Sequence, residues 1–515
     1  MGAMGQDDLV MRTRMRTFAK LLGFAVLIAS ARQSTFACTA FSMVGTNGHV
    51  VCFSFDFQFG AGHIYVNKRN VERERFLLYA EKPARWVSKY GSITFNLVGR
   101  DWPHDGMNEA GLVVLSLGLD ETRFPKPDDR LPIDENGWIQ YQLDNSATLH
   151  DVLESMKHIR ISSRSIGDSH FLLCDSSGAS MVVEYVDSHC KTYTGDALPY
   201  AVLTNDTYEH LLAYLTEQKR LPVEKRAPYR VTSSCCRFLH VAEKTDRLNV
   251  SGDSLVDYGF NILDDVRQSN SQYQVVYDPR NHRIHYRALN SGLRKTVSFA
   301  DFSFDSGTDV LMAEIQSARA GNLKDDFVPY DRRRAFDALI AFNKNTFEYL
   351  PNKVLESIVD APTRSRCLPG NSGARPDSRL TGRHNPEETK GLSVSFQEPP
   401  AKDVVLRSNE RTRAIDLAVK LNSVAPRDLS VVLALPEQGD LVPGRNVFVM
   451  PNPLTIPQGS SSGKATVVIL REGLGDAVDS KLAVNLISDD VPVSGTDQIL
   501  VRIRRESETG NNRDQ

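Results

Sequence analysis

The segment CTAFSMVGTNGHVVCFSFDF, residues 38–57, consists of two runs rich in β-branched and aromatic residues, separated by Thr46-Asn47-Gly48. An Asn-Gly pair between two such runs is a strong signal for a β-hairpin. We therefore predict that the fold begins with this hairpin and that its first strand starts at Cys38.

The length of the hairpin loop decides which side chain lies opposite Cys38. A three-residue loop places Asp56 opposite the cysteine. A two-residue loop on Asn47-Gly48 instead places Phe57 there and turns Asp56 to the other face, because side chains alternate along a strand. The register therefore decides whether a carboxylate meets the cysteine, and both registers stay open at this point.

The residues before Cys38 have the pattern of a secretory signal. A basic segment at residues 11–20 precedes an apolar run at residues 21–31, and Ala37 is a small residue at the expected cut. The apolar run is too short to span a bilayer, which takes about 20 residues. We therefore expect residues 1–37 to be removed on export to the periplasm or the exterior. Cys38 would then begin the mature chain, with no integral membrane segment left.

A cysteine at a signal cleavage site also fits a bacterial lipoprotein. Lipidation would modify the thiol or the amine of Cys38, so it excludes a role for both groups in chemistry. The preceding Thr35-Phe36-Ala37 lacks a leucine three residues before the cysteine and has a bulky phenylalanine beside the alanine. This segment favours simple cleavage over lipidation.

Composition limits the classes of function. The chain has 515 residues and a net charge of only −3, which disfavours a nucleic-acid or anionic-membrane partner. The length suggests two or three domains. Seven cysteines in an exported chain allow disulfides, but the number is odd and no spacing resembles a metal site.

Further hairpins and helices indicate an α+β fold for the first two thirds of the chain. Turns are predicted at residues 175–178 and 278–282, and amphipathic helices at residues 149–159 and from Tyr208. Antiparallel sheets covered by helices are the simplest arrangement of these elements. We place this domain at residues 38–355.

The last third of the chain has a different composition. Residues 356–390 are rich in Pro, Gly, Ser and charged residues beyond residue 360, and are predicted to form a flexible linker. Seven short alternating runs within residues 391–506 predict a C-terminal all-β sandwich domain. Residues 507–515 are expected to form a disordered tail.

A mature N-terminal cysteine brings a nucleophile and a base together on one residue. An α-amine titrates near pH 8 and a thiol near pH 8.5, so transfer of a proton between them is nearly balanced. No histidine partner is needed, and a nearby carboxylate would orient the ammonium that forms. Asp56 is the candidate for this carboxylate.

The sequence resembles the choloylglycine hydrolase and penicillin V acylase family of N-terminal-nucleophile amidases, from Cys38 to about residue 350. The resemblance rests on the order and spacing of seven motifs: CTAF at 38–41, SFDF at 54–57, DGMNEAGL at 105–112, WIQY with LDN at 138–145, LTN at 203–205, CRF at 236–238 and VVYD at 275–278. It implies a four-layer αββα sandwich for this domain, and it leaves a homo-oligomer open.

The resemblance also implies roles for individual residues. Cys38 would be the nucleophile and, through its amine, the base, while Asp56 would hold the amine and the thiol in place. Asn205 would donate its side-chain amide to the oxyanion, together with a backbone N–H at about His104. Arg237 would orient the site and favour the thiolate.

One position departs from the family pattern. Penicillin V acylases and bile salt hydrolases have an arginine three residues before the aspartate, where this chain has Phe53. Loss of that cation should raise the pKa of the thiol but leaves the pair of amine and thiol intact. Phe53 and Phe57 are candidates for an acyl pocket, with plain core packing as the favoured alternative.

Structural roles are expected for the adjacent cysteines and for several histidines. The adjacent Cys235 and Cys236 are expected in the core or in a disulfide rather than in catalysis. His63, His170 and His210 have no ligand spacing, so the sequence predicts no metal site at them.

The sequence therefore predicts an exported cysteine amidase that hydrolyses a linear acyl amide through a thioester. Its partner would be a small-molecule acyl amide, and the reaction would need no metal or organic cofactor. The competing hypothesis is a non-catalytic binding protein, secreted or lipid-anchored, that retains the same scaffold.

Overall fold

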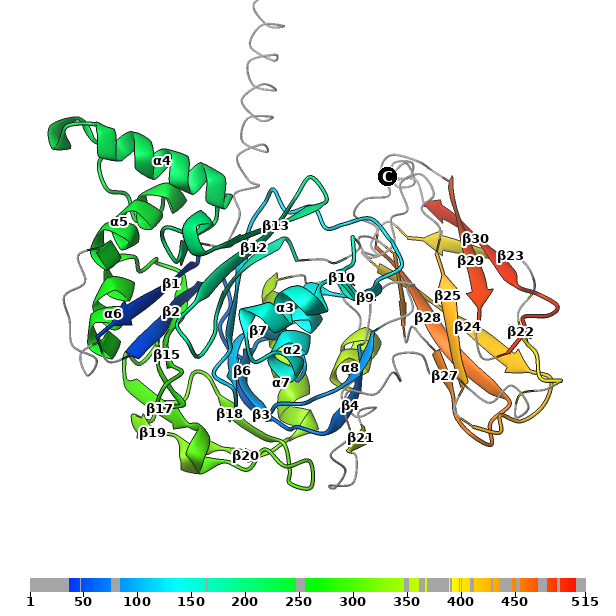
Figure 1. Cartoon of the computed structure of the whole chain (residues 1–515). Helices are drawn as coiled ribbons and strands as arrows, with labels where there is room; N and C mark the ends of the chain where they lie inside the picture. The colour runs from blue at the N-terminus through cyan, green and yellow to red at the C-terminus, as the bar shows by residue number, and fades with distance from the viewer. Residues whose placement is uncertain are drawn as a thin grey trace, which may run out of the picture.

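A computed structural model gives the arrangement of the chain (Figure 1). It describes residues 37–505 except for residues 47, 76–83, 164, 166, 247–254, 347–351, 361–365, 368–388, 390, 398, 400, 408–411, 428, 436–446, 451–453, 471–478 and 489–490. The expected signal peptide, most of the linker and the expected tail lie outside these residues.

The predicted N-terminal hairpin forms and lies inside a seven-stranded sheet. The strand order is β14-β1-β2-β15-β16-β17-β19. The strands are β1 Thr39–Gly45, β2 Gly48–Asp56, β14 Val202–Leu203, β15 Ser271–Asp278, β16 Arg283–Ala288, β17 Arg294–Ser298 and β19 Gly321–Asn322.

A second, nine-stranded sheet has the order β13-β12-β11-β8-β7-β6-β3-β18-β20. Its strands are β3 His63–Asn67, β6 Ser92–Asn96, β7 Pro103–Asn108, β8 Val113–Gly118, β11 Ser169–Cys174, β12 Ser180–Val186, β13 His189–Thr194, β18 Leu311–Glu314 and β20 Val328–Pro329. Short strands complete this part: β4 Val71–Glu74, β5 Arg85–Val87 and β21 Arg366–Cys367 in one small sheet, and β9 Leu131–Ile133 with β10 Ile159–Ile161 in another.

Helices pack against both large sheets. Helices α4 Tyr208–Arg220, α5 Ser234–Asp246 and α6 Leu255–Asp265 lie beside β1, β2 and β15, whereas α2 Glu135–Asn145 and α3 Leu149–Ser155 lie over the other sheet (Figure 1). Helices α7 Arg332–Thr346 and α8 Asn352–Asp360 pack on each other. Among the described helices, none has both the length and the apolar content needed to cross a membrane.

Side chains of the two large sheets meet in one buried core. Ser42 of β1 lies against Cys174 of β11, with 3.6 Å between the hydroxyl and the thiol. Tyr273 of β15 donates a hydrogen bond to Asp105 of β7 at 2.7 Å. A mixed α/β fold with several sheets therefore holds for this part of the chain.

The C-terminal region is built from β-strands alone in its described residues. A four-stranded sheet has the order β22-β24-β28-β26 and a five-stranded sheet the order β23-β30-β29-β25-β27. The strands are β22 Val394–Phe396, β23 Ala401–Leu406, β24 Thr412–Leu421, β25 Leu429–Ala434, β26 Val447–Met450, β27 Leu454–Ile456, β28 Ser462–Leu470, β29 Asp479–Ile487 and β30 Gln498–Arg505. The seven predicted strands form, and β23 and β27 are additional.

The register of the first hairpin differs from both predicted registers. Gly45 pairs with Gly48, and Thr39 therefore pairs with Ser54. The loop is one residue earlier than expected because Gly48 already belongs to the strand, with a positive φ of 151° that favours glycine. Cys38 is thus neither opposite Asp56 nor opposite Phe57 along the ladder.

The other local predictions mostly hold. The turns at residues 175–178 and 278–282 connect paired strands, and the helix from Tyr208 forms. The helix predicted over residues 149–159 is too long, because α3 ends at Ser155 and Ile159 begins strand β10.

Candidate active site

Cys38 lies directly before β1, which begins one residue later than predicted, and its side chain is buried, with 1% of the residue exposed. Its sulfur is 3.7 Å from the backbone oxygen of Asp56, so the two residues meet although the ladder does not pair them. Burial raises the pKa of the thiol, and the charges of Asp56 and Asp105 act in the same direction. The positive charge of Arg237 opposes them.

Asp56 is the last residue of β2 and its carboxylate is half satisfied. Ser54 donates to Oδ1 at 2.8 Å, and Ser271 donates to the same oxygen. The other oxygen, Oδ2, is buried and has no hydrogen-bond partner within the described part of the chain. Burial raises the pKa of Asp56 to about 6, although both serines and Arg237 lower it. A cation beside Oδ2 would complete this group.

Arg237 connects α5 to the beginning of β1. Its guanidinium donates to the hydroxyl of Thr39 at 3.1 Å and to the backbone oxygen of Cys38 at 3.4 Å. It also donates to Oδ1 of Asn205 at 2.7 Å. Burial lowers the pKa of this arginine, and the nearby charges of Asp56 and Cys38 oppose that change. The rigid fork of the guanidinium therefore fixes Cys38 and Asn205 relative to each other.

Asn205 follows β14 and is held at three atoms. Its backbone N–H donates to the hydroxyl of Ser234 at 2.8 Å, and its side-chain oxygen accepts from Arg237. Its amide nitrogen donates to the backbone oxygen of Gly118 at 2.9 Å. Since an amide nitrogen carries two hydrogens, one remains for another acceptor.

His104 occupies a bulge in β7. Phe95 pairs with Asp105 and Asn96 pairs with Pro103, so the ladder with β6 passes over His104. Such a bulged residue is left out of the strand pairing, which makes its backbone N–H a candidate donor to a ligand. The imidazole lies 5.5 Å from the ring of Phe55, and burial lowers its pKa to about 4. The structure therefore places His104 near β2, the strand that contains both Phe55 and Asp56.

A buried acid next to the site was absent from the predicted roles. Asp105 accepts hydrogen bonds from the hydroxyls of Tyr273 and Tyr277, and its negative charge acts on Cys38. Burial raises the pKa of Asp105 to about 7, although both tyrosines lower it. The residue lies within the DGMNEAGL motif, so the sequence contained a signal for it, but nothing in the sequence placed the two tyrosines beside it.

The supporting hydroxyls were also missed. Thr39, Ser54, Ser234 and Ser271 each bond to one of the predicted site residues. Small hydroxyl residues are common in strands and helix starts, so their type alone carries no signal.

The two proposed pocket residues lie in the core. Phe53 is fully buried, 6.1 Å from the ring of Phe55, and Phe57 stacks on Phe342 at 6.4 Å. One cavity of about 220 Å³ is lined by residues around His63, and another of about 440 Å³ by residues around Arg69. Neither of these two cavities is lined by Phe53 or Phe57, and the role of the two side chains in an acyl pocket stays a prediction.

Six cysteines are free thiols, namely Cys38, Cys52, Cys174, Cys190, Cys235 and Cys236. Within the described residues, one group of side chains could hold a metal ion: Asp206, His210 and Cys235, whose ligand atoms all lie within 4.8 Å of one another. The sequence gave no hint of it, because the cysteine comes from a different helix than the histidine.

Comparison with known proteins finds a similarity of the N-terminal part to one family. Residues 38–231 match the family model of linear amide C–N hydrolases, choloylglycine hydrolase family. A penicillin V acylase of Pectobacterium atrosepticum is 35% identical over 135 residues, which cover 23% of this chain and 35% of the acylase. The chain thus aligns with about a third of that relative's length.

Solved structures were compared with the chain as well. A penicillin V acylase from Agrobacterium tumefaciens aligns with a TM-score of 0.50 and 22% identity, over 57% of this chain and 98% of that one. A variant of the conjugated bile acid hydrolase from Clostridium perfringens aligns with a TM-score of 0.45 and 18% identity, over 55% of this chain and 98% of that one. The first alignment supports the mixed α/β architecture of the choloylglycine hydrolase family for the N-terminal part.

Proposed function

We propose that this chain hydrolyses a linear amide bond of a small acyl amide, with Cys38 as an N-terminal nucleophile. The observation that carries the proposal is the buried Oδ2 of Asp56, which lacks a partner in the described residues and belongs to the residue whose backbone oxygen contacts the Cys38 sulfur. Cleavage after Ala37 would create an ammonium group on Cys38. That group is the cation this carboxylate needs.

The proposed reaction uses the amine as a proton carrier. The amine takes the thiol proton while the sulfur bonds to the amide carbon. The ammonium then gives the proton to the leaving nitrogen as the carbon–nitrogen bond breaks, which leaves a thioester. Water gives a proton to the amine and attacks the thioester, and the sulfur recovers the proton as the acid departs.

The surrounding residues would favour the charged forms of this cycle. Arg237 lies against the Cys38 backbone and lowers the pKa of the thiol, so it supports the thiolate. The second amide hydrogen of Asn205 and the bulged N–H of His104 are the proposed donors to the oxyanion. Because Phe53 occupies the position where the family has an arginine, Arg237 is the proposed side-chain cation of the site.

We further propose the finer architecture and the location expected from the sequence. The αββα layering is supported by helices on both large sheets and by the core between these sheets. Residues 391–506 would act as an accessory β-sandwich, and removal of residues 1–37 on export would release the amine of Cys38.

Two matched changes test the nucleophile. Cys38→Ala should abolish hydrolysis of penicillin V, conjugated bile acids and simple N-acyl amino acids, whichever of these the wild type accepts. Cys190→Ser, which changes an exposed thiol, should leave hydrolysis unchanged. Hydrolysis that survives in Cys38→Ala would refute the mechanism.

A form of the protein that is not cleaved after Ala37 tests the role of the amine independently of the thiol. If Ala37 stays bonded to Cys38, the thiol remains but the amine is part of a peptide bond, and hydrolysis should be lost. Intact mass of the purified protein reports which form is present. A free N-terminal Cys38 without activity on any amide would favour the non-catalytic binding protein, and an acylated Cys38 would favour the lipid-anchored one.

A further inference from the structure

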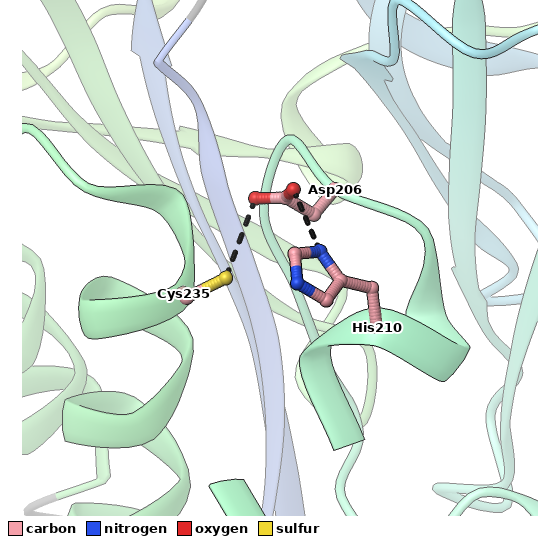
Figure 2. Close-up of side chains that lie close together, drawn as sticks. All are labelled: Asp206, His210 and Cys235. Atoms are coloured by element: carbon pink, nitrogen blue, oxygen red, sulfur yellow. Dashed lines mark hydrogen bonds and ion pairs between the residues drawn. The ribbon is translucent and has the colours of Figure 1, made fainter. Parts of the chain in front are cut away.

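Three side chains with metal-binding atoms converge beside the candidate active site (Figure 2). Nδ1 of His210 lies 3.1 Å from Oδ1 of Asp206, and the sulfur of Cys235 lies 3.6 Å from Oδ2 of the same carboxylate. Figure 2 shows the carboxylate above both the imidazole and the thiol, with the imidazole ring facing the sulfur. The three groups thus surround one point.

The three residues come from separate elements that the fold brings together. Asp206 lies in the segment between β14 and α4, His210 in the first turn of α4, and Cys235 in the first turn of α5. Ser234 already joins two of these segments, because it accepts a hydrogen bond from the N–H of Asn205 and donates one to Thr204 at 2.9 Å. The backbone around the cluster is therefore fixed, which limits the rearrangement that a ligand would require.

We propose that Asp206, His210 and Cys235 form a binding site for Zn²⁺. A thiolate, an imidazole and a carboxylate are the three ligand types that zinc prefers, and soft sulfur disfavours Mg²⁺ and Ca²⁺. Ligand atoms around tetrahedral zinc are about 3.3–3.6 Å apart at normal bond lengths. The two short contacts, Nδ1–Oδ1 at 3.1 Å and Sγ–Oδ2 at 3.6 Å, are near that separation and use the two different oxygens of Asp206. Because one atom from each residue already lies within 4.8 Å of the others, side-chain rotation of the carboxylate and the imidazole would place all three around one ion.

The exposure of the cluster fits a site with one open position. The side chain of His210 is 60% exposed and that of Asp206 is 25% exposed, whereas Cys235 is buried behind them. Zinc can therefore reach the cluster from solvent, and water would fill the fourth position. The ion would tie the segment of Asn205 to the helix of Arg237.

Without a metal, the same contacts amount to a His–Asp ion pair and a weak thiol hydrogen bond. His240 and Asp265 form such a pair elsewhere, also at 3.1 Å, and it is not part of a group of three ligands. This pair provides the matched control, since only the first cluster includes a cysteine.

The test measures binding of Zn²⁺ by calorimetry to full-length protein that has been stripped of metal with a chelator. We expect one equivalent of Zn²⁺ in the wild type. Cys235→Ser and His210→Gln should each weaken binding at least about 100-fold, because even the loss of a residue that only supports a zinc ligand costs 10–100-fold. Cys236→Ser and His240→Gln should bind like the wild type, since the Cys236 sulfur faces Tyr214 instead.

Co²⁺ gives a second readout that reports the sulfur directly. The wild type loaded with Co²⁺ should show thiolate-to-metal charge-transfer absorption, and Cys235→Ser should lack it while keeping the same far-UV circular dichroism. Absence of Zn²⁺ binding by the wild type, or equal binding by Cys235→Ser, would overturn the proposal. The Zn²⁺ and Co²⁺ measurements do not depend on amide hydrolysis, so they test the metal site even if the protein hydrolyses no amide.

Discussion

The N-terminal part of the molecule buries many charged groups, whereas the C-terminal sheets bury almost no polar side chains. Asp56, Asp105 and Arg237 are each at most 1% exposed. Among the described residues from 391 to 505, Thr466 is the one polar residue that is buried. Burying a charge costs free energy unless partners compensate it. The N-terminal part therefore carries a cost that the C-terminal sheets largely avoid, and under the proposed function part of that cost would serve chemistry.

The sharpest test of this contrast changes the C-terminal core. Leu417 in β24 is fully buried among apolar side chains, so Leu417→Ala should lower the free energy of unfolding by about 2–5 kcal/mol. The kcat/KM of amide hydrolysis should stay unchanged at temperatures where the variant is folded. Urea denaturation and steady-state kinetics measure the two quantities. A tenfold loss of kcat/KM in the folded variant would show that the two parts are functionally coupled.

The converse change removes a charge from the N-terminal part. Asp56→Asn keeps an oxygen for Ser54 and Ser271 but cannot balance an ammonium, so kcat/KM should fall about 100-fold or more. Steady-state kinetics on the processed enzyme check this, with far-UV circular dichroism as the control for folding. Activity within a few-fold of wild type would remove Asp56 from the mechanism.

Asp56 should also make the free energy of unfolding depend on pH. Its pKa is about 6 in the fold against an ordinary value of 3.8, so the folded state retains a proton that the unfolded state loses between these values. The contribution of Asp56 to stability should therefore fall as pH rises from about 4 to about 6, by about 1–3 kcal/mol, and stay level above that range. In a chain that retains Ala37, Asp56→Asn should flatten this part of the curve of unfolding free energy against pH. An unchanged slope would mean that burial does not penalise the charged form.

A smaller effect is expected at the buried acid Asp105. Tyr273→Phe removes one donor to its carboxylate, so the pKa of Asp105 should rise above about 7 and the acid should stay neutral at higher pH. Because its negative charge disfavours the thiolate, Cys38 should then react with iodoacetamide about two- to threefold faster at pH 7–8.

The control for this experiment is Tyr286→Phe. The hydroxyl of Tyr286 is buried without a hydrogen-bond partner in the described residues, so its removal should leave the alkylation rate of Cys38 unchanged. Peptide mass spectrometry separates Cys38 from the other thiols. A slower reaction of Cys38 in Tyr273→Phe would contradict the electrostatic role of Asp105.

The smallest effect belongs to the C-terminal polar residue. Thr466 donates a hydrogen bond to Asp416 at 2.7 Å, so Thr466→Val should cost only about 1 kcal/mol of stability. Hydrolysis should not change. Thermal denaturation at matched pH measures the difference, and a loss above about 3 kcal/mol would show that this region also depends on a buried polar group.

The sequence predicted the local elements better than their registration. The hairpin at Cys38 was evident from its two β-rich runs, but its register was one residue away from the nearer prediction, since Gly48 pairs within the ladder. Contacts across the fold were harder still: the partners of Asp56 come from both β2 and β15, and Tyr273 reaches Asp105 from another sheet. Such contacts depend on tertiary packing, which no local pattern encodes.

The two missed strands have a physical explanation. β23 begins directly after Pro399-Pro400, and β27 is a three-residue strand between Pro453 and Pro457. Proline normally argues against a strand, because it cannot donate to the ladder. Here the prolines flank the strands, so the pairing remains intact.

The pairing of β23 with β30 determines when the C-terminal sheets can be completed. Ala401 pairs with Leu500 and Leu406 with Arg505, in parallel. Strand β23 therefore cannot form its ladder until β30 has been synthesised. While the ribosome is still synthesising residues 407–497, β23 has no partner of its own. A nascent chain at that stage exposes strand edges that can pair with other molecules. A molecular chaperone that covers these edges would therefore protect the region during this stage of biosynthesis.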